Sequence, residues 1–155
     1  MAGSSGAPTL TGGCQCGAVR YALLSRPTGA SICHCRMCQK AFGSYFAPLA
    51  GVARADLAWT RGDPGRFRSS EAVERGFCRD CGTPLFYSVI EKDRISVSLG
   101  SLDDPSAVPP ESQFGQEGTQ PFFARLHKLP GETTADGTPP ETLARMASRQ
   151  HPDHD

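Results

Sequence analysis

The stretch FCRDCGTPLFY (residues 77–87) carries two cysteines separated by two residues and ends in an aromatic-rich segment. A two-residue spacer lets the chain fold back so that both sulfurs face one metal ion, and Gly82 permits a tight left-handed exit. A closed structural zinc site takes four ligands, so Cys78 and Cys81 need a second pair of cysteines. The fold therefore depends on which cysteines elsewhere in the chain complete this site.

The seven cysteines of the chain all fall into short groups, which are Cys14 and Cys16, then Cys33, Cys35 and Cys38, then Cys78 and Cys81. An odd number cannot all pair as disulfides, and clustered thiols in a chain without an export signal are more often metal ligands. Iron–sulfur proteins use other spacings, so zinc is the expected metal. Seven thiolates suggest four plus three, which predicts two zinc ions per chain.

Spacing alone leaves two divisions of these cysteines open. In the first, Cys78 and Cys81 pair with the cysteines of GGCQCGAV (residues 12–19), which leaves all three cysteines of CHCRMCQK (residues 33–40) for the second metal. In the second, they pair with the last two cysteines of CHCRMCQK, as in a simple zinc ribbon. Either way a three-thiolate site remains, and such a site leaves one coordination position for water or substrate.

Length and charge limit what else the protein can do. The chain has 155 residues, which fits one domain, and its sixteen basic and sixteen acidic side chains cancel. This balance gives no general reason to bind nucleic acid or a membrane surface. No apolar run approaches the ~18 residues that a membrane span needs, and the opening MAGSSGAPTL is no secretory signal. We expect a cytoplasmic protein whose recognition is local.

Short β-prone segments cut by glycine, proline and aspartate dominate the chain, and the clearest are residues 18–24, 44–52, 74–78, 83–89 and 94–102. RISVSL (residues 94–99) alternates apolar and polar residues, as a half-buried strand does. RMCQKAF (residues 36–42) can form only a short helix, and FFARLHKL (residues 122–129) is a candidate last strand. Strands without long helices between them predict a mainly β, antiparallel fold.

The domain boundaries follow from composition. Residues 1–9 are rich in glycine and serine and are expected to be a flexible tail, followed by one zinc-binding domain over residues 10–130. Residues 131–155 shift to Gly, Pro, Thr and charge and are expected to be a C-terminal tail. Within it, TPPETLARMASRQ starts with Thr138 as an N-cap and Glu141 three residues on, which predicts a short helix.

Four segments in order, GGCQCGAVRY, CHCRMCQKAFG, FCRDCGTPLFY and VSLGSLDDP, resemble the glutathione-dependent formaldehyde-activating enzyme family, which includes centromere protein V. The resemblance covers about residues 10–110. It implies a β-tent type of fold, with small antiparallel sheets and zinc-ribbon elements. It also selects the first division: a structural zinc is implied at Cys14, Cys16, Cys78 and Cys81, and the zinc associated with activity at the catalytic set Cys33, Cys35 and Cys38.

The activity that the resemblance implies is that of a carbon–sulfur lyase. The sulfur of glutathione, or of a similar thiol, adds to formaldehyde or another small aldehyde, or the adduct is cleaved in reverse. Three thiolates make a zinc site a poor generator of hydroxide, whereas a fourth thiol can bind there as a nucleophilic thiolate. The alternative is a non-catalytic zinc-binding module that binds glutathione or a protein partner. Both readings need the same ligands.

Residues beside the second cysteine group have competing interpretations. Arg36 and Lys40 could bind the carboxylates of glutathione, although solvated surface charge is the favoured interpretation. His34 is expected to have a structural or surface role, and Tyr45 and Phe46 to be core or cleft-wall residues.

The sequence departs from the resembled family after SLDDP. There the family carries a histidine followed by an apolar residue, and later a tryptophan, but this chain has Gln113 with Phe114 and then Phe122 with Phe123. Glutamine cannot transfer a proton as histidine does. This departure leaves the substrate less defined than the metal ligands.

Overall fold

The structure is a computed structural model that describes residues 8–154. Most of the predicted N-terminal tail, residues 1–7, lies outside the described residues. The strands are β1 (Leu10–Gly13), β2 (Arg20–Leu23), β3 (Thr28–Cys33), β4 (Ala47–Ala53), β5 (Leu57–Arg61), β6 (Gly65–Arg68), β7 (Val73–Phe77), β8 (Pro84–Val89), β9 (Arg94–Ser98) and β10 (Ser112–Phe114). The α-helices are α1 (Arg36–Phe42) and α2 (Pro140–Leu143), and short 3-10 helices span Arg54–Asp56, Leu99–Ser101, Pro105–Ala107, Gln116–Gly118 and Phe123–Lys128.

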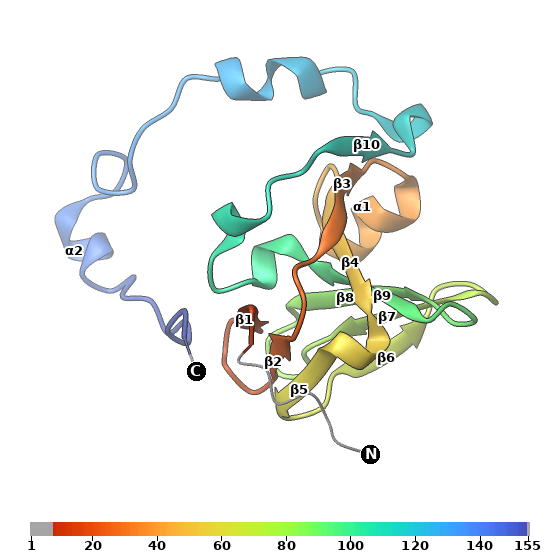
Figure 1. Ribbon diagram of the computed structural model, residues 1–155. Helices are drawn as coiled ribbons and strands as arrows, with labels where there is room; N and C mark the ends of the chain where they lie inside the picture. The colour runs from red at the N-terminus through yellow and green to blue at the C-terminus, as the bar shows by residue number, and fades with distance from the viewer. Residues whose placement is uncertain (1–7, 155) are drawn as a thin grey trace.

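Two sheets form the fold, and both contribute to the cysteine sites. A three-stranded sheet has the order β1-β2-β5, and a seven-stranded sheet has the order β10-β3-β4-β9-β8-β7-β6. Strand pairs within the sheets are antiparallel except β10 with β3, which is parallel. Figure 1 shows α1 beside the end of β3 and the hairpins of β6 to β9 on the opposite side of β4. The predicted mainly β fold is confirmed.

The main core lies between the two sheets. Its largest fully buried side chains include Tyr21, Leu23, Leu85, Phe86 and Val97. These large apolar groups supply most of the surface removed from water, which is the main stabilising contribution to folding. A smaller apolar cluster combines two cysteines of the second group with Ala47 and Leu49 of β4. The second cysteine group is therefore packed on the large sheet rather than on a free loop.

The predicted strand FFARLHKL is wrong, because Phe123–Lys128 forms a 3-10 helix. Phe122, the residue before it, has φ −93° and ψ −2°, which turns the chain out of the extended conformation. Phe122, Phe123 and Leu126 instead pack at helical spacing against neighbouring residues.

The C-terminal segment forms an arch that leaves the sheets and returns beside β1 (Figure 1). The predicted terminal helix exists as α2, but Thr138 does not cap it. Pro139 holds the N-cap position without a side-chain hydrogen bond, since the helix starts one residue later than expected, at Pro140. The return is fixed by the N–H of His151, which donates to the carbonyl of Gln15 at 2.8 Å.

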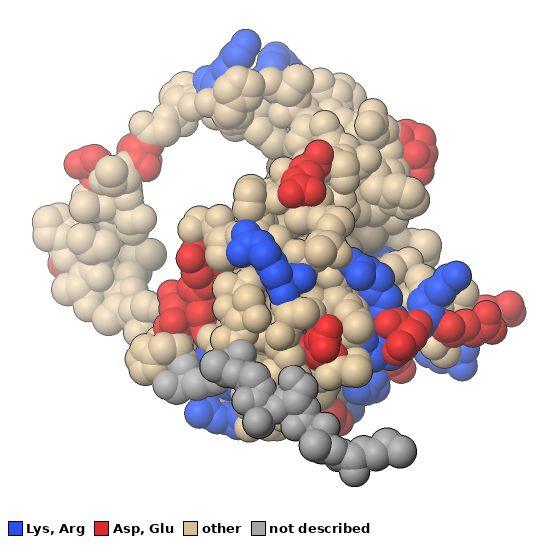
Figure 2. All heavy atoms as spheres, in the orientation of Figure 1, with Lys and Arg blue, Asp and Glu red and all other residues tan. Residues whose placement is uncertain are grey.

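The surface carries both signs of charge, in line with the balanced composition. Basic and acidic side chains are interspersed over the face seen in Figure 2. No helix within residues 8–154 is long and apolar enough to cross a membrane.

Candidate metal centres

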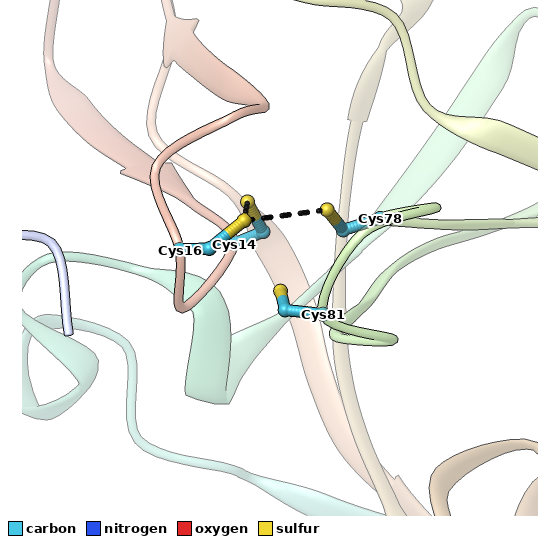
Figure 3. A group of neighbouring side chains, drawn as sticks. All are labelled: Cys14, Cys16, Cys78 and Cys81. Carbon is cyan, nitrogen blue, oxygen red and sulfur yellow. Dashed lines mark hydrogen bonds between the residues drawn. The ribbon is translucent and has the colours of Figure 1, made fainter. Parts of the chain in front are cut away.

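The first centre brings together two pairs of cysteines from opposite parts of the domain. Cys14 and Cys16 lie in the loop between β1 and β2, and Cys78 and Cys81 in the turn between β7 and β8 (Figure 3). All four sulfurs lie within 4.8 Å of one another, with Cys14 to Cys16 at 3.6 Å and Cys16 to Cys78 at 3.7 Å. Sulfurs at the corners of a tetrahedron with metal–sulfur bonds of ~2.3 Å lie ~3.8 Å apart, so this set fits a tetrahedral ion.

Local backbone geometry shapes both arms of this centre. Gly17 and Gly82, which each follow the second cysteine of a pair, have φ of 78°. This left-handed conformation is accessible to glycine at little cost and turns the chain away from the sulfurs, as expected for Gly82. The N–H of Gly82 donates to the carbonyl of Cys78 at 3.0 Å, and the N–H of Val19 points to the sulfur of Cys14 at 3.3 Å.

The second centre is built within six residues. Cys33 ends β3, Cys35 precedes α1 and Cys38 lies in the helix, and their sulfurs lie within 4.8 Å of one another. Cys33 and Cys38 are buried, and Cys35 is half-buried. All seven cysteines are free thiols. The structure thus groups the cysteines in the first of the two divisions, four plus three, and both groups could hold a metal ion.

The thiols of the two centres differ in how readily they ionise. Burial raises the pKa of Cys81, but hydrogen bonds with Thr83 outweigh it and lower the pKa to about 6. Burial raises the pKa of Cys33 to about 12. The pKa of Cys35 is lowered, because hydrogen bonds within the cluster and the positive charge of Arg75 outweigh the effect of burial. Each centre therefore contains one thiol favoured as the thiolate that a metal requires.

Arg75, on β7, is a residue of the second centre that sequence reasoning missed. It is 7% exposed, its Nη2 lies 3.5 Å from the sulfur of Cys38, and its Nε donates to the hydroxyl of Ser69 at 3.1 Å. The guanidinium also stacks over Tyr87, 5.1 Å from the ring centroid. Three thiolates around one divalent ion leave a net negative charge, which a buried arginine beside Cys38 compensates. In sequence, Arg75 is one charged residue in a β-prone segment, and nothing marks it as buried.

His34 stands between two cysteines but is not part of the cluster. It is fully buried, and its Nε2 donates to Oε1 of Gln113 at 2.8 Å. Its ring also makes edge contacts with Phe46 and Phe123, at centroid distances of 6.1 and 4.7 Å. His34 thus has a structural role. Gln113 and Phe123, which mark the departure from the resembled family, are its partners.

The remaining sequence candidates lie at the surface around α1. Arg36 and Lys40 are exposed, as favoured from the sequence, and both line a pocket next to Arg75. Tyr45 is half exposed and packs edge-on against Phe122 at 4.9 Å, where the two rings line another pocket. Charged and aromatic walls therefore flank the second centre.

Comparison with known proteins agrees with this arrangement. The sequence profile of the glutathione-dependent formaldehyde-activating enzymes matches residues 9–117, which include both cysteine centres. The chain belongs to the glutathione-dependent formaldehyde-activating enzyme family. The matched segment ends after Gln113, so the residue that departs from the expected histidine lies inside the family region.

Two relatives illustrate the range of this family. A protein of Schizosaccharomyces pombe described as an uncharacterised lyase is 28% identical over 81 residues, which make up 52% of this chain and 58% of the yeast protein. A protein of Halomonas elongata, provisionally named a glutathione-dependent formaldehyde-activating enzyme, is 24% identical over 90% of this chain and 95% of its own length.

A solved structure shares the fold of this chain. The crystal structure of a Rhodobacter sphaeroides protein superposes with a TM-score of 0.55 and 24% sequence identity, covering 67% of this chain and 99% of that protein. This similarity concerns the fold alone.

Proposed function

We propose that this protein is a zinc-dependent carbon–sulfur lyase that acts on the adduct of glutathione, or a similar thiol, with formaldehyde or another small aldehyde. Cys33, Cys35 and Cys38 would hold the zinc associated with activity, and the four-cysteine centre a structural zinc. The observation that carries the proposal is the three-thiol centre itself, because a closed four-thiol set exists elsewhere and this one offers only three protein ligands.

The proposed reaction balances without an oxidant or reductant. In the forward direction the thiol sulfur forms a bond to the carbonyl carbon, and the thiol proton ends on the carbonyl oxygen. In reverse the carbon–sulfur bond breaks and the proton returns to sulfur. A zinc ion held by Cys33, Cys35 and Cys38 would lower the pKa of the substrate thiol and favour its nucleophilic thiolate form.

The chain's own residues would prepare the site for this chemistry. Arg75 donates toward the sulfur of Cys38 and offsets the negative charge of the cluster. Burial raises the pKa of Tyr87, so its phenol stays protonated beside the cysteines. The side chain of Gln113 accepts a hydrogen bond from His34 and offers no titratable group for proton transfer.

Calorimetry and NMR together test the proposal. Zinc-loaded protein is titrated with glutathione, and exchange between formaldehyde and its glutathione adduct is followed by NMR with and without protein. We expect binding and an exchange rate above the spontaneous one, both lost in Cys35→Ser. Binding without acceleration would instead indicate the non-catalytic module, and absence of both would rule out glutathione as the substrate.

A further inference from the structure

A cationic pocket lies against the second centre. It has a volume of about 350 Å³, and its walls include Arg36, Met37 and Lys40 from α1, Phe67 from β6 and Arg75 from β7. This volume falls in the ~300–1,000 Å³ range of small-molecule sites. Within the part of the chain that the structure describes, no aspartate or glutamate lines the pocket. Two exposed cations, Arg36 and Lys40, and the buried Arg75 therefore border one small space.

Arg36 and Lys40 have no acidic partner within residues 8–154, whereas Arg75 faces the sulfur of Cys38. The guanidinium of Arg36 donates a hydrogen bond to the neutral side chain of Gln39 at 3.3 Å. Over residues 8–154, none of the three cations forms an ion pair, and Nη1 of the buried Arg75 has no hydrogen-bond partner. The exposed Arg36 and Lys40 are therefore the donors that an anionic group in the pocket would meet.

The other walls of the pocket are apolar. Phe67 and Met37 are 61% and 52% exposed, which is high for such large apolar side chains. A ligand that combines a carboxylate with methylene groups would cover these surfaces while its charge meets the arginines and the lysine.

Arg75 and α1 connect this pocket to the cysteines. Nη2 of Arg75 lies 3.5 Å from the sulfur of Cys38. Arg36 and Lys40 stand two residues before and two residues after Cys38 on the same short helix. A larger pocket of about 540 Å³ beside Tyr45 also has two cations, Arg125 and Lys128, but none of its lining residues is a cysteine ligand or bonds to one. Of these two cationic pockets, the one lined by Arg36, Lys40 and Arg75 is therefore connected to the second centre through a direct contact.

We propose that this pocket binds a carboxylate of the thiol substrate, with Arg36 and Lys40 as specificity residues and Arg75 as the link to Cys38. The inference rests on the proposed function and narrows its substrate to thiols that carry a carboxylate, as glutathione does. Thiols of similar reactivity without a carboxylate would reach the centre but bind more weakly.

Affinity measurements on the zinc-loaded full chain test this assignment. Dissociation constants are measured by calorimetry for glutathione, its glycine ethyl ester and cysteamine, a thiol without a carboxylate. Arg36→Gln and Lys40→Gln should each weaken glutathione binding about fivefold and leave cysteamine unchanged. Lys128→Gln, in the other pocket, is the matched control and should change neither. Wild-type affinity for glutathione should also fall with added salt, as expected for exposed charges.

The glycine ester identifies which carboxylate is bound. If the ester loses as much affinity as the variants do, the pocket takes the glycine end, and if it keeps full affinity, the pocket takes the γ-glutamyl end. The assignment would be overturned if Lys40→Gln weakened the binding of glutathione and of cysteamine equally. It would also be overturned if neither variant weakened the binding of glutathione, even if the protein accelerates adduct exchange. If binding depends on the carboxylate but adduct exchange is not accelerated, the pocket assignment is supported and the proposed lyase activity is refuted. No binding of glutathione at all would overturn both proposals.

Discussion

One buried ion pair holds the SLDDP segment to β2. Nη1 and Nη2 of Arg20 donate to the two carboxylate oxygens of Asp103 at 2.8 and 2.6 Å, with side-chain exposures of 3% and 11%. The hydroxyl of Thr11 donates to the same carboxylate. Burial raises the pKa of Asp103, but the hydrogen bonds from Arg20 and Thr11 outweigh it and hold the pKa below its ordinary value. Asp103 is therefore a stabilising group whose contribution depends on its charge.

Asp103→Asn should destabilise the protein by about 3 kcal/mol at pH 7, because it removes the negative partner of a buried guanidinium. Because the folded pKa is lowered, the contribution of Asp103 is fully present above the ordinary value of 3.8 and is lost as pH falls through the folded pKa. Urea unfolding of the wild type and of Asp103→Asn from pH 7 to pH 2.5 measures this contribution. The gap in unfolding free energy should shrink below pH ~4. Thiolate titration affects both proteins alike, so a constant gap would contradict this account.

The sequence predicted that the cysteines are metal ligands, but it did not predict which residues surround them. The spacing of all seven favoured a four-plus-three division because zinc chemistry fixes the number of ligands. The burial of Arg75 and the hydrogen bond between His34 and Gln113 could not be foreseen. Each depends on contacts between residues far apart in the chain, such as Arg75 with Cys38, which local patterns do not encode.

At the scale of elements, the strands recovered from sequence are those with aromatic or β-branched residues, such as β8 and β9. Strands with weak patterns were missed. TGASIC of β3 is mostly small residues, and SQF of β10 is exposed along its length. β3 pairs with β4 in antiparallel and with β10 in parallel, and this tertiary pairing overrides the weak local propensity of both segments. The strand predicted at FFARLHKL failed for the opposite reason: its local pattern favours a strand, but its aromatic rings pack in a helical turn against residues that flank α1.

Glycine is required at one position in the pairing of β7 with β8. Gly76 pairs with Phe86, and a Cβ at Gly76 would overlap the Phe86 ring. Phe86 is 2% exposed, with the guanidinium of Arg66 over its ring, so the ring has little room to shift. Gly76→Ala should lower the unfolding free energy by about 1–3 kcal/mol, the usual cost of overpacking.

Urea unfolding measures this effect, and Gly100→Ala is the matched control. Gly100 lies in a 3-10 helix without positive φ, and an added Cβ there meets no atom within 4 Å. We expect it to be neutral or slightly stabilising, because it reduces the freedom of the unfolded chain. Equal stability of the two variants would show that the core around Phe86 yields to the added methyl group.

At the scale of the whole molecule, the two centres differ in what they join. The four-cysteine centre connects the β1–β2 loop to the β7–β8 turn, and Cys16 and Cys78 are 62 positions apart. By the chain-entropy relation for a cross-link, closing such a loop contributes about 4 kcal/mol, against about 2 kcal/mol for the six-residue span of the other centre. A metal ion in the first centre would thus hold the two sheets together, and one in the second centre would hold α1 to the end of β3.

Removal of one ligand from each centre tests this division of roles. Cys81→Ser and Cys35→Ser are a matched pair, since both side chains are half-buried and each belongs to one centre. Cys81→Ser should lose one metal ion per chain and at least about 4 kcal/mol of unfolding free energy, because the long loop is released. Cys35→Ser should also lose one ion but keep a cooperative unfolding transition and native near-UV circular dichroism. Metal analysis by mass spectrometry and urea titration measure both. If Cys35→Ser unfolded the domain as fully as Cys81→Ser, the second centre would be structural, and its open ligand position could no longer be taken as a sign of catalysis.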